Sequence, residues 1–362
     1  MCLSDFHLIR PPFETSQEET LAWLIAAHRA SDGTEVEEQL LRVGCKPDRI
    51  AKRGHINPDY LHRDWSQMEI FRLLENPAGL GLNVRSAIYS KHADQIFEEF
   101  YPTEENPPED LIHVTCTGYI APSGAQKLIS KRRWGEKTTV THAYHMGCYG
   151  SIPALRMAKG FLYSSKQRVD IVHTEICSIH ANPSLHTLDQ LVSQSLFADG
   201  FIKYSMRENK ENLGLLLHTT REEIIPDSTG AMSWDVVNWG FAMSLSKEVP
   251  VLIKRALRGF LERLAKNTKW TSEELCKNAL FAVHPGGPKI LVYIQELLNL
   301  QDAQIKDSFE ILKQYGNMSS ATLPHIWKQI LENAPHGTPI VSLAFGPGLS
   351  ICGAIMETQC GG

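Results

Sequence analysis

The sequence predicts an α/β protein in which strands and helices alternate along the chain. Runs rich in β-branched, aromatic and aliphatic residues, such as 111–118 and 168–179, are typical of buried strands. Segments 83–101 and 247–266 carry apolar residues at helical spacing, which is typical of amphipathic helices. Because the strands are apolar with little alternation, we expect sheets that are covered by helices on both faces.

The composition is that of a globular protein with more than one core. The chain has 362 residues, of which 43% are hydrophobic and 21% charged. The net charge of -5 is spread without long blocks, which argues against nucleic acid as a partner. No apolar stretch predicts a membrane span or a secretory signal. Eight cysteines without a CxxC pair or a framework spacing favour a reducing cytoplasm and no metal site.

The first hundred residues predict a helical opening. Segment 17–45 has two amphipathic stretches, and 83–101 is the next clear helix. Between them lies a basic cluster that would attract a phosphate-bearing substrate if its side chains share a face. A solvated turn is the alternative. The cluster consists of Lys46, Arg49, Lys52 and Arg53.

Cys148 is the candidate nucleophile. An apolar β-type run, 139–144, gives way at Gly-Cys-Tyr-Gly to a segment with helical spacing, 151–162. A cysteine at that junction lies near free N–H groups and the positive end of a helix dipole, which favour the thiolate. The alternative is an inert, buried thiol, because free cysteine is among the most buried residue types.

The alternation continues beyond Cys148 and restarts in the second half of the chain. Nothing between the elements reads as a linker, so we expect two closely packed halves. The expected strands are 168–179, 201–205, 213–220, 279–284 and two runs within 339–357 joined by Gly-Pro-Gly; the expected helices are 188–197, 247–266, 289–300 and 319–333.

Three turns gather groups of complementary chemistry. They contain Cys148, His284 in the segment 284–288, and Asn317 in the segment 316–320. A histidine can accept the proton of a thiol, and an amide N–H beside it can stabilise an enolate or oxyanion. Taken singly, the histidine could be a strand-end residue and the asparagine a turn or cap residue.

A series of short motifs follows in order from about residue 111 to the C-terminus. They are Val114-Thr-Cys-Thr-Gly-Tyr119, Met146-Gly-Cys-Tyr-Gly150, Ala154-Leu-Arg-Met-Ala-Lys159, Glu175-Ile-Cys-Ser178, Ser195-Leu-Phe-Ala-Asp-Gly200, Ile225-Pro-Asp-Ser-Thr-Gly-Ala231, Lys247-Glu-Val-Pro250, His284-Pro-Gly-Gly-Pro288, Tyr315-Gly-Asn-Met-Ser-Ser320 and Gly346-Pro-Gly-Leu349. These motifs resemble the thiolase-fold condensing enzymes, and most closely the chalcone synthase-like, or type III, polyketide synthases, including bacterial-type members. The first hundred residues match that family less specifically.

This resemblance implies a thiolase-like αβαβα five-layer fold built from two similar halves, 1–212 and 213–362, and a homodimer. Cys148 would carry the acyl chain, and His284 and Asn317 would reach it from the second half. They would bind the carbonyl oxygen of a malonyl-type extender, whose loss of CO2 gives an enolate for a Claisen condensation. No cofactor or metal is implied. The loop Gly346, Pro347 and Gly348 would contribute to the oxyanion site.

The resemblance also marks a substrate pocket that departs from the plant pattern. Phe197 matches one of two gating phenylalanines, and Met243 replaces the other. Trp234 replaces a glycine, so its bulk should shrink or redirect the pocket. Cys177 and His180 replace polar threonines, and Ser319 matches the family serine. Aromatic starters and a chalcone product are therefore not expected.

Three functions remain open on the sequence alone. The first is extension of a fatty acyl starter with malonyl-CoA to an alkylpyrone or alkylresorcinol. The second is a stand-alone ketosynthase that joins two β-ketoacyl chains on acyl carrier proteins into an α-pyrone. The third is a non-catalytic thiolase-fold partner subunit, which the joint presence of Cys148, His284 and Asn317 argues against. A basic run could dock a carrier protein or a CoA phosphate, or could be a solvated helix end; it comprises Lys127, Lys131, Arg132 and Arg133.

Overall fold

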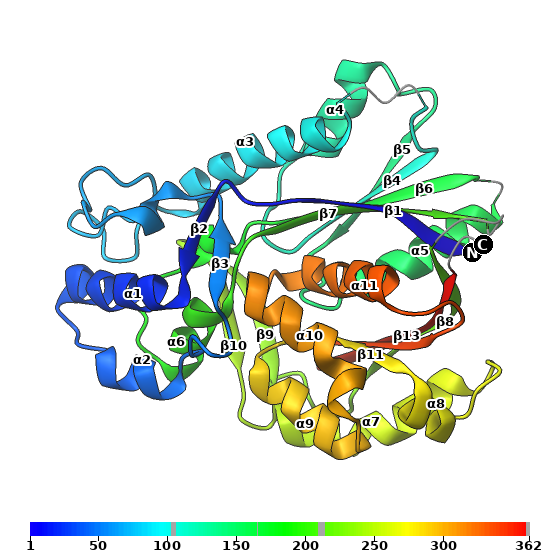
Figure 1. Ribbon diagram of the computed structural model, residues 1–362. Helices are drawn as coiled ribbons and strands as arrows, with labels where there is room; N and C mark the ends of the chain where they lie inside the picture. The colour runs from blue at the N-terminus through cyan, green and yellow to red at the C-terminus, as the bar shows by residue number, and fades with distance from the viewer. Residues whose placement is uncertain (103–105, 165, 209–213, 360–362) are drawn as a thin grey trace.

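A nine-stranded sheet runs through the centre of the protein (Figure 1), in a computed structural model that describes residues 1–102, 106–164, 166–208 and 214–359. The strand order is β11-β12-β13-β8-β1-β7-β6-β4-β5. The bounds are β1 (Cys2–Ile9), β4 (Asp110–Thr115), β5 (Thr139–Tyr144), β6 (Arg168–Glu175), β7 (Gly200–Arg207), β8 (Gly214–Ile224), β11 (Leu280–Val283), β12 (Pro339–Gly346) and β13 (Ser350–Gln359).

The sheet consists of two parts that meet at a narrow seam. On one side lie β5, β4, β6, β7 and β1, and on the other β8, β13, β12 and β11. The outer pairs, β4 with β5 and β11 with β12, are parallel, whereas the strands nearest the seam are antiparallel. At the seam, β1 pairs with β8 only at Cys2 with Leu216 and at Leu3 with Leu215. The two parts of the sheet are therefore held together mainly by the helices that pack between them.

Two helices fill the space between the two parts of the sheet. They are α5 (Ser151–Tyr163) and α11 (Thr322–Asn333), and their apolar side chains share one buried cluster with both sheets. A second cluster joins β11, β12 and β13 to α7 (Val249–Ala265), α9 (Pro288–Leu298) and α10 (Asp302–Tyr315). A third joins β4 and β6 to α3 (Leu82–Phe100) and α4 (Gly124–Arg132). The successive layers are helices, sheet, helices, sheet, helices (Figure 1), so the predicted αβαβα fold is confirmed. The predicted boundary between the halves, at residues 212 and 213, lies outside the described residues.

Most of the remaining elements surround the end of the sheet at which the candidate nucleophile lies. Helices α1 (Gln17–Asp32), α2 (Glu37–Val43) and α6 (Leu188–Leu196) lie together on one side, next to the hairpin of β2 (Phe13–Ser16) and β3 (Lys52–His55). A second hairpin pairs β9 (Met232–Val237) with β10 (Gly240–Leu245). The others are α8 (Ser272–Asn278) and the 3-10 turns Pro58–Leu61, Cys177–His180 and Ser319–Ala321.

The helix boundaries follow from local sequence signals. Ser16 begins α1 with a capping box, in which its hydroxyl accepts from the Glu19 N–H and the Glu19 carboxylate accepts from the Ser16 N–H. Gly33 ends the same helix with a φ of +82°, which glycine adopts without steric cost. The predicted helical opening therefore forms two separate helices.

Several strands were not predicted or were predicted with different ends. β1, the β2–β3 hairpin and the β9–β10 hairpin were missed, because their sequences alternate weakly between polar and apolar residues. The predicted strand 168–179 ends at Glu175, after which Cys177–His180 forms a 3-10 turn. The predicted helix 319–333 begins with another such turn, so α11 starts at Thr322.

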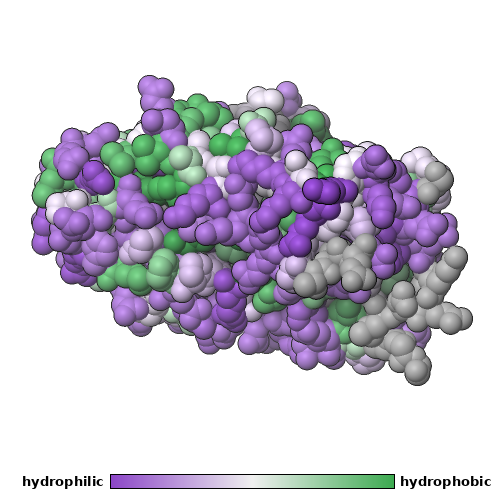
Figure 2. Space-filling view, turned by 90° about the horizontal axis from the view of Figure 1, so that it is seen from above, coloured by the Kyte–Doolittle hydropathy of each residue, from purple (hydrophilic) through white to green (hydrophobic). Residues whose placement is uncertain are grey.

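The outer surface over α3 and α4 is mainly hydrophilic, with apolar groups scattered among the polar ones (Figure 2). Among the described helices, none combines the length and apolar character that a membrane span requires.

Candidate active site

Cys148 lies in the turn that joins β5 to the buried central helix α5, and its side chain is 9% exposed. Gly147 precedes it with a φ of +78°, a conformation that favours glycine. A Cβ atom at Gly147 would lie 2.8 Å from Cδ of Pro347, so the loop after β12 packs directly against this turn. The sequence therefore needs glycine here for two reasons, and the turn directs the cysteine toward the second half of the chain.

Asn317 approaches from that second half, between α10 and the turn at Ser319. Its main chain forms a bridge with Phe197: the Asn317 N–H donates to the Leu196 carbonyl at 3.0 Å, and the Ala198 N–H donates to the Asn317 carbonyl at 2.9 Å. The side-chain Oδ1 of Asn317 accepts from the Ser319 N–H at 2.9 Å. Because Oδ1 is engaged, the amide presents its NH2 group as a donor toward Cys148.

His284 directly follows β11, and its N–H donates to the Leu343 carbonyl of β12 at 2.8 Å. The residue is 2% exposed, and neither ring nitrogen has a hydrogen-bond partner among the described residues. Burial lowers the pKa of His284 to about 3, so the imidazole is neutral. A neutral, buried and unpaired imidazole can donate from one nitrogen and accept at the other.

Burial also shifts the pKa of Cys148. It raises the pKa of the thiol to about 12, while the neighbouring Ser319 hydroxyl and Asn317 amide act in the opposite direction. Cys148 on its own is thus a thiol, and the thiolate expected from its place before a helix needs a proton acceptor.

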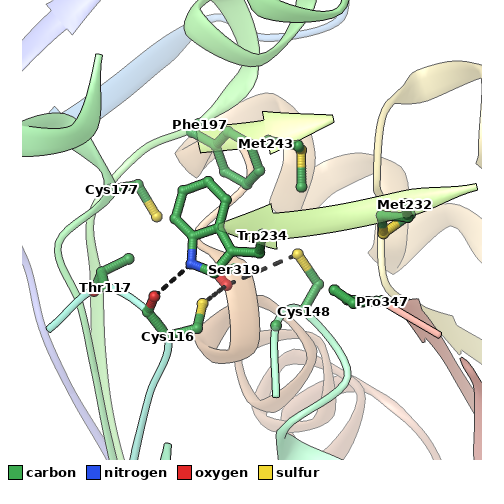
Figure 3. Close-up of a pocket in the computed structure, with 11 residues that line it drawn as sticks. Cys116, Thr117, Cys148, Cys177, Phe197, Met232, Trp234, Met243, Ser319 and Pro347 are labelled. Atoms are coloured by element: carbon green, nitrogen blue, oxygen red, sulfur yellow. Dashed lines mark hydrogen bonds between the residues drawn. The ribbon is translucent and has the colours of Figure 1, made fainter. Parts of the chain in front are cut away.

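A cavity of about 330 Å3 opens beside Cys148 (Figure 3). Trp234 of β9 lies at its centre, below Phe197, and donates from Nε1 to the Cys116 carbonyl at 2.6 Å. Met243 of β10 lies directly across the hairpin from Trp234. No charged side chain is among the lining residues, which are Cys116, Thr117, Gly147, Cys148, Cys177, Phe197, Met232, Trp234, Met243, Ser319 and Pro347.

The sequence analysis did not single out Cys116, although the residue lies within a quoted motif. Its Sγ lies 2.8 Å from Oγ of Ser319, which in turn lies 3.8 Å from Sγ of Cys148 (Figure 3). On its other side the same sulfur donates to the buried Glu175 carboxylate at 3.4 Å. A hydrogen-bonded chain therefore runs from Glu175 to Cys148. Only the fold brings these distant segments together. Hydrophobic periodicity and motif spacing in the sequence therefore could not reveal this series of hydrogen bonds.

All but one of the residues that the resemblance assigned to the substrate pocket line the cavity beside Cys148. Phe197, Met243, Trp234, Cys177 and Ser319 line the cavity. His180 does not: its ring stacks on Phe241 with centroids 4.4 Å apart, Nε2 donates to the Thr117 carbonyl, and Nδ1 accepts from the Phe241 N–H. His180 thus supports the cavity wall from behind.

The loop Gly346, Pro347 and Gly348 lies beside the Cys148 turn. Pro347 lines the cavity, and a Cβ at Gly346 would lie 2.2 Å from the Tyr149 ring. The Leu349 N–H donates to Oγ of Ser228 at 2.7 Å, which anchors the loop from the other side.

The predicted basic cluster does not form a single face. Lys46 and Arg49 are exposed, and Lys52 pairs with Glu14 at 2.7 Å. Arg53 is 5% exposed and points into the protein, because side chains alternate along β3. In the second basic run, Lys127 and Lys131 pair with Asp94 and Glu98 of α3, as on a solvated helix face.

Among the described residues, no group of three His, Cys, Asp or Glu side chains is arranged to hold a metal ion.

The five-layer fold, with a cysteine at the start of its buried central helix, defines the class: this is a thiolase-fold protein. Residues 92–203 match the N-terminal domain, and residues 216–359 the C-terminal domain, of the chalcone and stilbene synthases. The chain therefore belongs to that family, the type III polyketide synthases, which are enzymes of the acyltransferase type.

Similar proteins come from distant organisms. A probable polyketide synthase of Dictyostelium discoideum is 28% identical over 86% of this chain, and the match spans 10% of that relative's length. A putative chalcone synthase of Bacillus subtilis is 26% identical over 71% of this chain and 72% of its own.

Among solved structures, the C-terminal type III polyketide synthase domain of Steely1 from Dictyostelium is similar, with a TM-score of 0.86 and 24% identity over 99% of both chains. The 1,3,6,8-tetrahydroxynaphthalene synthase of Streptomyces coelicolor has a TM-score of 0.84 and 22% identity, over 99% of this chain and 100% of that one. At these identities the likeness establishes the fold.

Proposed function

We propose that this protein is a decarboxylating ketosynthase that forms carbon–carbon bonds between acyl thioesters through an acyl-Cys148 intermediate. The observation that carries the proposal is that the oriented amide of Asn317 donates toward the Cys148 thiol, which itself borders a cavity with no charged residue in its lining. Family membership supports the same chemistry.

Acylation is the first step. His284 accepts the Cys148 proton, the resulting thiolate attacks the thioester carbonyl of an acyl-CoA, and CoA leaves as a thiol after taking up that proton. The tetrahedral oxyanion is stabilised by the Cys148 N–H and by a main-chain N–H of the loop at Gly346–Gly348. The reaction as proposed uses neither a metal nor a cofactor.

Decarboxylation and condensation follow at the same place. His284 and Asn317 donate hydrogen bonds to the thioester oxygen of a malonyl unit, and loss of CO2 leaves an enolate held by the same two donors. Two neutral donors suit this step, because they stabilise a charge that develops on oxygen, and exclusion of water strengthens them. The enolate carbon then attacks the Cys148 thioester, which forms the new bond and releases the thiolate.

The cavity lining supports a fatty acyl starter with malonyl-CoA as extender. Met232, Met243, Trp234, Phe197 and the cysteines offer apolar and sulfur-bearing contacts but little to recognise a polar starter. Trp234 occupies much of the space in which a bulky ring would have to close. We therefore propose alkylpyrone- or alkylresorcinol-type products, formed by a cytoplasmic homodimer.

Intact-protein mass spectrometry with a panel of acyl-CoA and acyl-carrier thioesters tests the nucleophile. The wild-type protein is expected to gain one acyl mass, and Cys148→Ala to gain none. Cys177→Ala is the matched control, since Cys177 is another buried cysteine of the same cavity. No acyl mass on the wild type with any donor, or equal labelling of Cys148→Ala, would refute the assignment. If only carrier-bound β-ketoacyl chains react, the two-chain joining reaction replaces the proposed one.

A further inference from the structure

A second cavity lies behind Phe197, on the side away from Cys148. It spans about 230 Å3, part of it open to solvent, beside the β2–β3 hairpin. Phe197 lines both cavities, so it separates them. Most of the second lining is polar: it comprises Thr15, Thr20, Arg53, Gly54, His55, Tyr60, Ser178 and Phe197.

Arg53 is the unusual member of this lining. Its Nη1 donates to the carbonyls of Gln194 and Phe197 at 2.8 and 2.7 Å. Its Nε and Nη2 are buried and have no hydrogen-bond partner among the described residues. A Cβ atom at Gly316 would lie 3.1 Å from Cγ of Arg53, so the side chain is held close against the turn that carries Asn317. Two donor nitrogens of a fixed guanidinium are thus left unused next to the cavity.

The cavity carries a positive charge that no described carboxylate contacts directly. Burial lowers the pKa of Arg53 to about 10, which still leaves it a cation at neutral pH. No described carboxylate is ion-paired with it, and the nearby Asp199 carboxylate accepts from the Ser178 hydroxyl and from the N–H groups of Ser178 and Ile56. His55 adds no charge, since burial lowers its pKa to about 4. Asp199 acts on Arg53 only through space. A buried cation without a directly bonded counterion is costly, which favours an anion in the space.

The fold satisfies another buried arginine completely. Arg85 donates from Nε to the Leu80 carbonyl, from Nη1 to the carbonyls of Ile179 and Ala181, and from Nη2 to the Ala78 carbonyl. The unused donors of Arg53 are therefore a feature of its site, and burial alone does not explain them.

The two unused donors lie on one edge of the guanidinium. Nε and Nη2 together form a planar fork that matches the two oxygens of a carboxylate. Elsewhere in this chain the same two atoms bind carboxylates three times, at 2.7 to 2.8 Å: Arg29 with Glu35, Arg168 with Asp170 and Arg263 with Glu223.

We propose that the cavity behind Phe197 is a carboxylate-binding site in which Nε and Nη2 of Arg53 hold the two carboxylate oxygens. The carboxylate comes either from a free small acid or from the far end of an acyl chain on Cys148. Binding of a free acid is independent of the proposed function, whereas binding of a chain end rests on it. In both cases the bound anion stabilises the guanidinium, which also holds the Phe197 carbonyl beside Asn317.

The first experiment measures thermal unfolding with sodium acetate and with sodium chloride at equal ionic strength. Acetate is expected to raise the Tm of the wild type by about 2 °C at saturation, more than chloride does. Arg53→Lys, which keeps the charge but loses the fork, should lose this difference. Arg85→Lys is the matched control and should keep it. If Arg53→Lys fails to fold, a size series on the wild type decides: formate and acetate should stabilise, and benzoate should not, because the cavity is small.

The second experiment compares acylation of Cys148 by succinyl-, glutaryl- and adipyl-CoA with acylation by monocarboxylic acyl-CoA of equal length, followed by intact-protein mass spectrometry. If the carboxylate is the end of the chain, Arg53→Lys lowers labelling by the best dicarboxylic donor about tenfold relative to its monocarboxylic partner. If only this selective loss of dicarboxylic labelling is observed, the site binds chain ends. If only the acetate-specific rise in Tm is observed, the site binds free acids.

The proposal is overturned if acetate and chloride act equally on the wild type and Arg53→Lys changes no donor preference. It is also overturned if acetate stabilises the wild type more than chloride does and Arg53→Lys shows the same difference. Absence of labelling by every acyl-CoA would instead refute the proposed function, and the thermal experiment would still decide the carboxylate site.

Discussion

Phe197 stands between two cavities of opposite chemistry. The cavity beside Cys148 has no charged side chain in its lining, whereas the one behind Phe197 contains the cation Arg53. Burial favours the neutral form of Cys148, which lines the first cavity, and of His284, which lies outside that lining. The difference indicates that charge enters the first cavity only with the substrate and during the reaction, while the second holds a permanent charge that needs an anion.

This separation suits the proposed chemistry. A fixed cation in the reaction cavity would attract the malonyl carboxylate and oppose its loss as CO2. Neutral donors such as the Asn317 amide interact most strongly once the enolate has formed. The variants described below change the reaction cavity and leave the second cavity intact, in order of decreasing expected effect.

His284→Ala should have the largest effect. Loss of one donor to the enolate is expected to lower the rate of malonyl-CoA decarboxylation by about 100- to 1000-fold, measured as release of CO2. His325→Gln is the matched control: His325 is also buried and neutral, but its Nδ1 is engaged by the Ala321 carbonyl. A loss of less than about threefold in His284→Ala would contradict the assigned role.

The same variant also tests the proton transfer from Cys148. Burial raises the pKa of the thiol, and a proton acceptor opposes that shift by favouring the thiolate. Removal of His284 should therefore move the pH profile of Cys148 alkylation by iodoacetamide to higher pH, so that alkylation at pH 7 slows and recovers as the pH rises. An unchanged profile would exclude His284 as the proton acceptor.

Trp234→Ala should have the next largest effect, and on product more than on rate. Truncation of the indole enlarges the apolar cavity and removes the hydrogen bond to the Cys116 carbonyl. We expect longer or more extended products by mass spectrometry, with an acylation rate within about threefold of the wild type, because Trp234 makes no contact required for thioester attack. Trp239→Ala, in the turn of the same hairpin but outside the lining, should leave the product distribution unchanged.

Ser319→Ala should have the smallest effect. The Ser319 hydroxyl lies 3.8 Å from the Cys148 sulfur, so its loss should slow acylation only about two- to fivefold. The measurement is the initial rate of acyl-mass gain. A loss above about 50-fold would mean that the chain from Glu175 through Cys116 takes part in acylation.

Helices and strands could be predicted from the sequence wherever apolar residues recurred at a clear helical or strand spacing. The β12–β13 hairpin and the helices α3, α5 and α7 have clear periods and were predicted within a few residues. β1 was missed because Ser4, Asp5 and His7 interrupt its apolar residues. Its role depends on pairing with β7 and β8, which are more than 190 residues away, and no local pattern reports that.

The candidate site was predictable only in part, and for a related reason. The resemblance named Cys148, Asn317 and most of the lining, but counting charges placed Arg53 on the surface with Lys52. Adjacent strand residues point to opposite faces, so Lys52 reaches Glu14 while Arg53 turns inward. The roles of Cys148, His284 and Asn317 remain predictions until the variants are measured.

The bridge between Phe197 and Asn317 has an evolutionary consequence, because it is made by main-chain atoms alone. Main-chain hydrogen bonds do not depend on which side chain a residue carries. The side chain at 197 can therefore diverge, and with it the range of accepted chains, without displacing the asparagine that the chemistry requires. Chimeras that join the first half of one relative to the second half of another should keep this alignment for the same reason, so substrate range and reaction can be inherited from different parents.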